Sequence, residues 1–164
     1  MNARLGYPAD ARLLIINADD FGMCLATNAA TIQAMRAGIA SSTTIMTPCP
    51  WAPHALRLLA QHPDLAFGVH LTLIAEHPGY RWGPLAGRDA VPSLVDAAGS
   101  FYRDDQRDAF LARAALHEVE IEFRAQITTV LAAGLAPTHL DWHCGAGVGT
   151  TAGREVVAAC AIAL

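Results

Sequence analysis

Residues 13–22 read LLIINADDFG, a short apolar run followed by two adjacent carboxylates. The run at residues 13–16 is partly β-branched, which predicts a buried strand. Asp19 and Asp20 come at the carboxyl end of that strand, where α/β sheets and barrels carry their chemistry. Two adjacent carboxylates oppose each other's ionisation unless a cation or a shared proton relieves the repulsion. The stretch therefore predicts an α/β fold with a metal at the strand end, and one carboxylate left free to act on water.

The composition is that of one compact domain. The chain has 164 residues, of which 53% are hydrophobic and 16% charged, and this length is sufficient for a hydrophobic core. The net charge of -4, with scattered Arg and Lys, gives no support for nucleic-acid binding. The longest apolar stretch, residues 156–164, is too short to cross a bilayer, and no signal peptide is evident. We expect a single domain over residues 1–164 that binds neither nucleic acid nor membrane.

The cysteines give an expectation about the cellular compartment. Cys24, Cys49, Cys144 and Cys160 form no CxxC pair and have no spacing typical of a disulfide framework. We expect reduced thiols, which are typical of a cytoplasmic protein.

Strands and helices alternate along the sequence. Helices are predicted at 25–37, 53–61 and 108–133, and strands after the first at 42–47, 65–73 and 138–142. This alternation favours a parallel sheet with right-handed crossovers. Residues 76–99 are irregular and rich in Gly and Pro, with Tyr80 and Trp82 among them. They form either a substrate-facing loop or a surface loop whose aromatic side chains pack back onto the body, and the second interpretation is slightly favoured.

Polar residues recur at the carboxyl ends of three predicted strands. They are Asp19 and Asp20, then His70, then His139, Asp141 and His143. The carboxyl ends of parallel strands share one face, and strand alternation sends residues 139, 141 and 143 to one side. One aspartate with two imidazoles is a ligand set suited to a catalytic divalent ion.

Each of these residues also has an alternative role. Either aspartate is a preferred N-cap for the next helix. His70, on an otherwise apolar strand, is more often a hydrogen-bonded core histidine than a ligand, and His139 and His143 can be structural. The glycines at 145, 147 and 149 indicate a phosphate- or nucleotide-binding loop only weakly, because they lack the spacing and the Lys-Ser or Lys-Thr of known motifs.

Three motifs together resemble the YdjC-like carbohydrate deacetylases, which include the chito-oligosaccharide deacetylases. They are NADDFG at residues 17–22, GVHLT at residues 68–72 and THLDWH at residues 138–143. Asn28, residues 38–44 and residues 80–85 are supporting matches. The resemblance implies a distorted, TIM-like α/β barrel and metal-dependent removal of the acetyl group from an N-acetylated amino sugar or short oligosaccharide.

The resemblance also implies roles for individual residues. Asp20, His70 and His143 would bind a divalent metal, Mg or Zn, and Asp19 would be the catalytic base. The metal would lower the pKa of a bound water, and that water would attack the acetamide carbonyl. Expected contacts with the carbohydrate substrate are His139, Asp141, Tyr80 and Trp82.

Two departures from the family pattern qualify this reading. Trp142 and Cys144 flank His143, where the family usually has a serine and further histidines, and the thiol would shift the metal preference toward a softer ion. Family members also continue well beyond this length, so we expect only the N-terminal part of the barrel. Because an open half-barrel exposes strand edges, two alternatives follow: a homodimer, or a non-catalytic truncated homologue that keeps the metal site.

Overall fold

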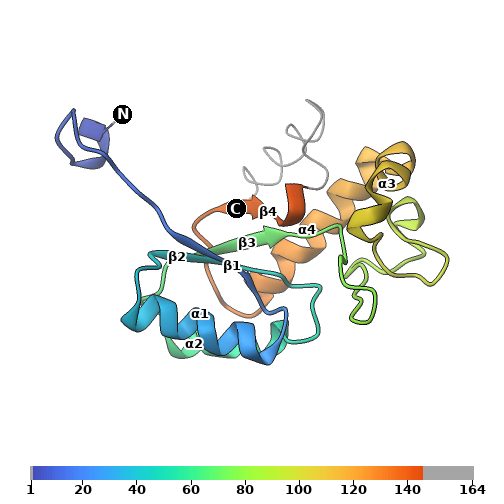
Figure 1. The fold of residues 1–164 in the computed structure, drawn as a ribbon, viewed down its shortest axis with the longest axis horizontal. Coiled ribbons are helices and arrows are strands. Elements are labelled where there is room, and N and C mark those ends of the chain that lie inside the picture. The colour runs from blue at the N-terminus through green and yellow to red at the C-terminus, as the bar shows by residue number, and fades with distance from the viewer. Residues whose placement is uncertain (1, 146–164) are drawn as a thin grey trace.

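The structure, a computed structural model, describes residues 2–145 and contains one parallel sheet with helices packed on it (Figure 1). The strands are β1 (Asn17–Phe21), β2 (Ser42–Ile45), β3 (Phe67–Leu71) and β4 (Leu140–Trp142). They pair in the order β1-β2-β3-β4, and every pair is parallel. The predicted α/β fold with a parallel sheet is therefore confirmed.

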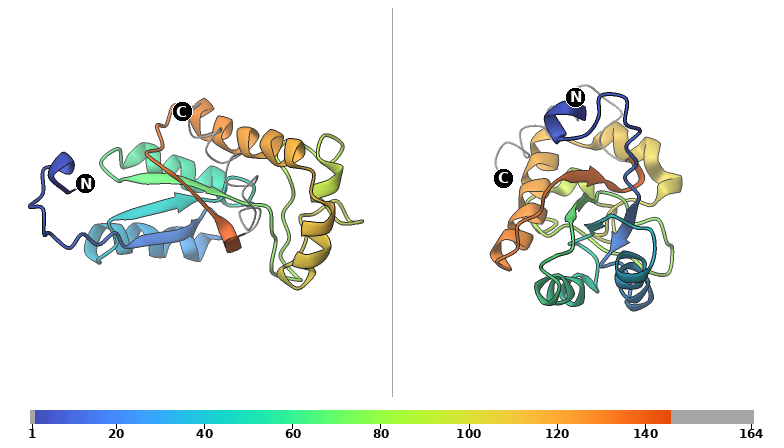
Figure 2. Two further views of the ribbon diagram at one scale, coloured as in Figure 1. Left: turned by 90° about the horizontal axis from the view of Figure 1, so that it is seen from above. Right: turned by 90° about the vertical axis from the view of Figure 1, so that its left-hand side faces the viewer.

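Helices connect these strands. In the described residues they are α1 (Leu25–Ala37), α2 (Ala52–Gln61), α3 (Arg107–Arg113) and α4 (Leu116–Ala132). Short 3-10 turns lie at Asn2–Leu5, Pro92–Leu94, Asp104–Gln106 and His143–Gly145. Seen along the strands, α1 and α2 lie side by side below the sheet, and α4 lies to its left (Figure 2, right). The bounds of α1 are those predicted, and α2 begins one residue earlier than predicted.

The first strand differs from its prediction. The apolar residues 13–16 are not a buried strand, since Leu14 and Ile15 are 79% and 77% exposed. The strand is instead the polar stretch that follows them. Its register explains the difference, because Asn17 pairs with Ser42 at the start of β2. The apolar run thus leads up to the sheet and meets it at Ile16, whose carbonyl accepts the backbone N–H groups of Ser41 and Ser42 at 2.9 and 3.3 Å.

The predicted helix at 108–133 is broken into α3 and α4. Ala114 and Ala115 have ψ angles of 118° and 125°, which interrupt the helical backbone. The interruption is stabilised from a distant part of the chain, because the Ser93 hydroxyl accepts the N–H of Ala115 at 2.9 Å. Glu118 in turn accepts both the N–H and the hydroxyl of Ser93 at 2.7 Å. A tertiary contact therefore overrides the helical periodicity.

The core lies between the sheet and the helices and continues under the long connection from β3 to α3. Its fully buried members include Phe21, Ile45, Val69 and Leu71 from the strands, Phe123 and Val130 from α4, and Leu94 and Phe101 from the connection. A core of this extent holds the strands in a fixed register. It therefore fixes the positions of the side chains at the strand ends.

The strands run toward the long connection and α3, at the right of Figure 1, and they begin on the side of the N-terminal segment, at its left. Close packing of β3 on β4 depends on Gly68, where a Cβ would lie 2.5 Å from the His139 carbonyl oxygen. The N–H of Val69 donates to that same oxygen at 3.0 Å. This contact sets where β4 lies relative to β3, and therefore where Asp141 lies relative to His70.

Candidate active site

An irregularity in β1 places both adjacent carboxylates near the same imidazole. Neighbouring residues of a regular strand point to opposite faces. In β1 the register shifts between Ala18 and Phe21, and Asp20 has a left-handed φ of 63°. A bulge of this kind redirects side chains, and ligand atoms of Asp20 and of Asp19 both come within 4.8 Å of one on His70. The predicted pair is thus brought together on one side.

A buried side-chain amide stabilises the turn that follows β1. The Asn28 side chain, fully buried in α1, accepts the N–H of Gly22 at 2.7 Å. Gly22 itself has a φ of 102°, and a Cβ there would lie 3.1 Å from the Met46 carbonyl oxygen. Asn28 and Gly22 therefore fix the backbone immediately after Asp20.

His70 is buried in the middle of the site. Its Nε2 lies 3.4 Å from Asp20 Oδ1, and its Nδ1 lies 2.6 Å from Asp141 Oδ1. Asp141 Oδ2 also accepts the Thr44 hydroxyl at 3.0 Å. A carboxylate on Nδ1 fixes the ring orientation and the tautomer, so that Nε2 is the nitrogen that faces Asp20.

His143 reaches the same carboxylate from the turn after β4. Its Nδ1 lies 3.1 Å from Asp20 Oδ1, and its Nε2 lies 2.8 Å from Glu76 Oε2. The ring is 4% exposed and packs edge-on against His70, with ring centroids 5.3 Å apart. Three parts of the chain that are far apart in sequence thus meet at Asp20.

The site is a chain of alternating carboxylates and imidazoles: Glu76, His143, Asp20, His70 and Asp141. Burial opposes an imidazolium, but hydrogen bonds to Asp141 and Asp20 raise the pKa of His70 to about 9. Bonds to Asp20, Cys144 and Glu76 likewise raise the pKa of His143 to about 11. Although burial acts in the opposite direction, hydrogen bonds from both rings hold the pKa of the Asp20 carboxyl well below its usual range.

This arrangement fits a divalent cation. The ligand atoms of Asp20, His70 and His143 all lie within 4.8 Å of one another. Both imidazoles direct a nitrogen at Asp20 Oδ1, so a fully protonated pair of rings would place two protons between the three side chains. A divalent ion that replaced those two protons would leave the total charge unchanged, and one carboxylate with two imidazoles is a common set of ligands for such ions.

Asp19 lies near His70, on which the groups around Asp20 and Asp141 meet. Its Oδ1 accepts the Asn17 amide at 2.6 Å, and the same amide donates to the Thr44 hydroxyl at 2.9 Å. Asp19 is exposed, whereas His70 is buried. A carboxylate that faces solvent next to a cation site is chemically able to take a proton from water.

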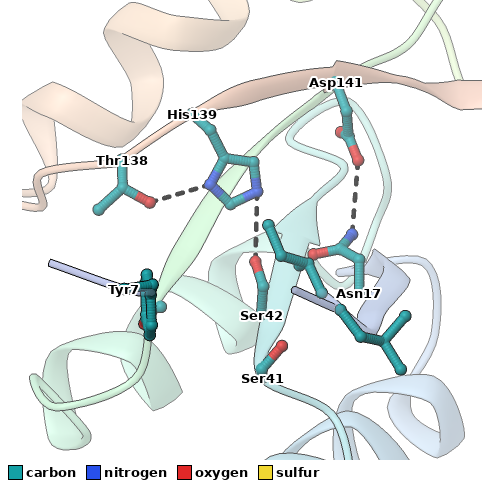
Figure 3. A pocket seen from close by; sticks show the side chains of 10 residues that line it. Tyr7, Asn17, Ser41, Ser42, Thr138, His139 and Asp141 are labelled. Carbon is teal, nitrogen blue, oxygen red and sulfur yellow. Dashed lines mark hydrogen bonds between the residues drawn. The ribbon is translucent and has the colours of Figure 1, made fainter. Parts of the chain in front are cut away.

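His139 does not join the cluster. It shares a side of β4 with Asp141, as strand alternation predicts, but it lies at the opposite end of the sheet (Figure 3). Its ring contacts the hydroxyls of Thr138 and Ser42 at 2.9 and 3.3 Å and lines a pocket of about 630 Å³ beside the starts of the strands. Asp141 and Asn17 border this pocket too, and the Asn17 amide nitrogen lies 3.4 Å from Asp141 Oδ2 (Figure 3).

Tyr80 and Trp82, in the long connection, pack back onto the body. The Tyr80 hydroxyl donates to the Met23 carbonyl at 2.6 Å, and Trp82 Nε1 donates to the Ile74 carbonyl at 3.0 Å. Trp82 is 4% exposed, and its ring centroid lies 6.3 Å from that of His143. The structure thus places Trp82 behind His143, as a support for that ring.

Comparison with known proteins identifies the family. The sequence profile of the family described as "YdjC-like protein" matches residues 13–163. The chain belongs to the YdjC-like family.

Two curated relatives of this chain are named as deacetylases. A protein of Brevibacillus brevis named carbohydrate deacetylase is 39% identical over 79% of this chain and 48% of its own length. A chitooligosaccharide deacetylase of Yersinia enterocolitica is also 39% identical, over 80% of this chain and 49% of its own length. A crystal structure from Enterococcus faecalis, described as a "putative cellobiose-phosphate cleavage protein", is 35% identical with a TM-score of 0.81. It matches 91% of this chain and 55% of that one.

The YdjC-like chain spans about half the length of the curated relatives that it matches. The sheet with strands in sequence order is therefore part of a TIM-like α/β barrel, as predicted. Within residues 2–145, no helix has the length and apolar character that crossing a bilayer requires. Cys24, Cys49 and Cys144 form no disulfide within the described residues, while Cys160 and the glycines at 147 and 149 lie outside those residues.

Sequence reasoning missed two members of the site. Glu76 contacts His143, and Thr44 connects Asp141 to Asn17 through hydrogen bonds. The sequence does contain an indication for Glu76, because it is an acidic residue five positions beyond the end of β3. It falls, however, at the start of the irregular stretch 76–99, which is interpreted as a loop. Thr44 lacked a signal, because a threonine in a strand is typical of any sheet.

Proposed function

We propose that this YdjC-like protein is a metal-dependent hydrolase that removes the N-acetyl group from an acetylated amino sugar or short oligosaccharide. The observation that carries the proposal is the meeting of Asp20, His70 and His143, with Asp19 near His70. The relatives named carbohydrate deacetylase and chitooligosaccharide deacetylase support the same reaction class. Amide hydrolysis requires an activated water and a stabilised oxyanion, and this group of side chains is suited to both.

We assign a separate role to each side chain of the site. Asp20, His70 and His143 would hold the cation, which when bound supplies the Lewis acidity that polarises an amide carbonyl and acidifies water. Asp19 accepts the proton of the attacking water, because it is a carboxylate that water can reach and that Asn17 orients at 2.6 Å. Asp141 holds the ring of His70 so that its Nε2 faces the cation site.

Mg and Zn are both candidates for the ion. A carboxylate suits either of them, whereas two imidazoles favour zinc over magnesium. Addition of each ion to metal-free protein, followed by measurement of affinity, would decide between them.

The residues that we expected to contact the substrate differ in how well their positions allow that contact. Trp82 is too buried to stack on a sugar and instead supports His143. Tyr80 is hydrogen-bonded to Met23 but only partly buried, so one face of its ring remains a candidate for sugar contact. His139 lies at the other end of the sheet, and we do not retain it as a contact for the acetyl-bearing sugar.

Acetate release from N,N'-diacetylchitobiose tests the proposal. We expect release that a chelator abolishes and that added metal restores. Asp19→Asn removes the base and should lower kcat by about 100-fold or more, since general-base catalysis typically contributes 10²–10⁴-fold. Asp89→Asn is the matched control, because the side chain of Asp89 is fully exposed on the long connection and should leave kcat unchanged.

Other outcomes would favour the alternatives. Tight metal binding at Asp20, His70 and His143 without turnover of any acetylated sugar would indicate a non-catalytic homologue. Turnover that is insensitive to both the chelator and Asp19→Asn would contradict the mechanism. Thermal stabilisation by a nucleotide but not by a metal would instead favour a phosphate-binding protein.

We also propose that the protein forms a homodimer through its apolar approach to β1. Leu14 and Ile15 are largely exposed there, and exposed apolar groups next to a strand edge favour association. Light scattering should give twice the monomer mass, and Ile15→Lys should restore the monomer. A monomeric wild-type protein at high concentration would refute this proposal.

A further inference from the structure

The imidazole of His143 has a second side that the proposed metal centre does not use. While Nδ1 faces Asp20, Nε2 lies 2.8 Å from Glu76 Oε2 and 3.2 Å from Cys144 Sγ. The ligand atoms of Glu76, His143 and Cys144 all lie within 4.8 Å of one another. Oxygen, nitrogen and sulfur ligands thus meet at one point outside the group around Asp20.

The separations between these atoms are close to those in a metal site. Zinc binds sulfur at about 2.3 Å and nitrogen or oxygen at about 2.0–2.2 Å in tetrahedral geometry, so two ligand atoms lie roughly 3.4–3.6 Å apart. The observed pairs, at 3.2 Å and 2.8 Å, would have to open by less than about 1 Å. Side-chain rotation alone can supply such a change.

The surroundings leave this point open to an ion. Cys144 is exposed, with a left-handed φ of 52°, and it follows His143 directly in the 3-10 turn after β4. Trp82 packs against the ring of His143 and limits its movement. An ion can therefore arrive from solvent on the Cys144 side, and water can complete its coordination.

We propose that Glu76, His143 and Cys144 form a second cation site that is selective for thiophilic divalent ions such as Cd²⁺ and Zn²⁺. Thiolate ligands select soft ions, whereas Mg²⁺ and Mn²⁺ prefer oxygen. Binding releases one proton from the Cys144 thiol and one from His143 Nε2, since both atoms must offer a lone pair. The site is distinct from the proposed active site, although it shares His143 with it.

Sharing one imidazole makes the two sites antagonistic. With a soft ion on Nε2, the remaining proton of His143 stays on Nδ1 and donates to Asp20. The centre around Asp20 and His70 then loses its third ligand. A soft ion at Cys144 should therefore weaken the binding of a hard ion at Asp20.

Titration of metal-free, reduced protein with Cd²⁺ tests the site, through the ultraviolet charge-transfer band of a cadmium thiolate. We expect a band that saturates at one equivalent and that Cys144→Ser abolishes. Cys24→Ser is the matched control, since Cys24 is a free thiol at the N-cap of α1 and its replacement should leave the band intact. Glu76→Gln should weaken the Cd²⁺ affinity at least tenfold, while Glu120→Gln, at a half-exposed position of α4 that is paired with Arg124, should not.

Several results would overturn the proposal, and none of them depends on deacetylase activity. A wild-type protein without the band has no thiolate site, and a band that survives in Cys144→Ser belongs to another cysteine. An unchanged affinity in Glu76→Gln would remove the carboxylate from the site. Sharing of His143 is tested with bound Mn²⁺, because one equivalent of Cd²⁺ should release more Mn²⁺ from the wild type than from Cys144→Ser, in which Cd²⁺ can act only by direct competition at Asp20. Equal release from both would contradict antagonism.

Discussion

Asp141→Asn is the most direct test of how the site holds a cation. Asp141 does not belong to the three proposed ligands, yet its Oδ1 lies 2.6 Å from His70 Nδ1. The asparagine oxygen can still accept this hydrogen bond, so the ring of His70 keeps its position. What the substitution removes is the negative charge that makes the opposite nitrogen, Nε2, a stronger ligand.

The size of the effect follows from the geometry. Replacement of a charge-assisted hydrogen bond by a neutral one costs about 1–1.5 kcal/mol, because ionised partners roughly double the strength of the bond. Groups that orient metal-binding histidines typically contribute 10–100-fold in metal affinity. The Asp141 side chain is 35% exposed, so solvent screening places the expectation near the lower limit. We therefore expect about a tenfold loss of affinity, or about 1.4 kcal/mol.

Electron paramagnetic resonance of free Mn²⁺ measures this affinity without interference from thiols, which bind Mn²⁺ weakly. Wild type, Asp141→Asn and the exposed control Asp89→Asn would be compared at the same pH. An affinity of Asp141→Asn within twofold of wild type would show that the charge on Asp141 does not act through His70. A loss beyond about 1,000-fold would exceed the range for such groups and would make Asp141 a direct ligand.

Three further predictions concern the supports of the site. Glu122→Ala should lower the free energy of unfolding, measured with urea, by about 2–4 kcal/mol, because this fully buried carboxylate accepts the N–H groups that follow Pro84 in the long connection. Gly68→Ala should lower it by about 1–3 kcal/mol, because a Cβ would meet a β4 carbonyl at 2.5 Å; unchanged stability would show that the strands can separate freely. Metal affinity should fall as the pH is lowered from 9 to 6, because the pKa values of His70 and His143 are raised and protons therefore compete with the ion for both rings. The fall should be up to tenfold per pH unit for each proton displaced, and calorimetry at several pH values would measure how the affinity depends on pH.

The helices α1 and α2 and the strands β2 and β3 could be predicted because local pattern and tertiary environment agree there. The first strand could not. Several of its side chains are polar, yet Asn17 is accommodated because its amide donates to Thr44, which is 27 residues away, as well as to the neighbouring Asp19. The break before α4 was likewise invisible, since it depends on Ser93, 22 residues away.

The prediction for the last motif was correct in part, and strand geometry explains which part. A strand rises about 3.3 Å per residue, so His139 and His143 would be about 13 Å apart along β4 and cannot contact the same ion. Alternation correctly places Asp141 on the side of His139 (Figure 3). His143 reaches Asp20 only because the chain leaves the strand after Trp142 and turns back. The residue spacing predicted that His139 and Asp141 share one side of the strand. It did not predict how far His139 lies from the cluster, or the turn that brings His143 to Asp20.

The two adjacent carboxylates avoid mutual repulsion because the backbone gives each its own partners. The left-handed conformation at Asp20 directs that carboxylate to two imidazoles, whereas Asp19 meets the amide of Asn17. Such a conformation is costly for an aspartate and persists only where its surroundings enforce it. Asn28 supplies that constraint from α1 through Gly22. The separate chemical roles of Asp19 and Asp20 thus depend on a buried asparagine that contacts neither of them through its side-chain hydrogen bonds.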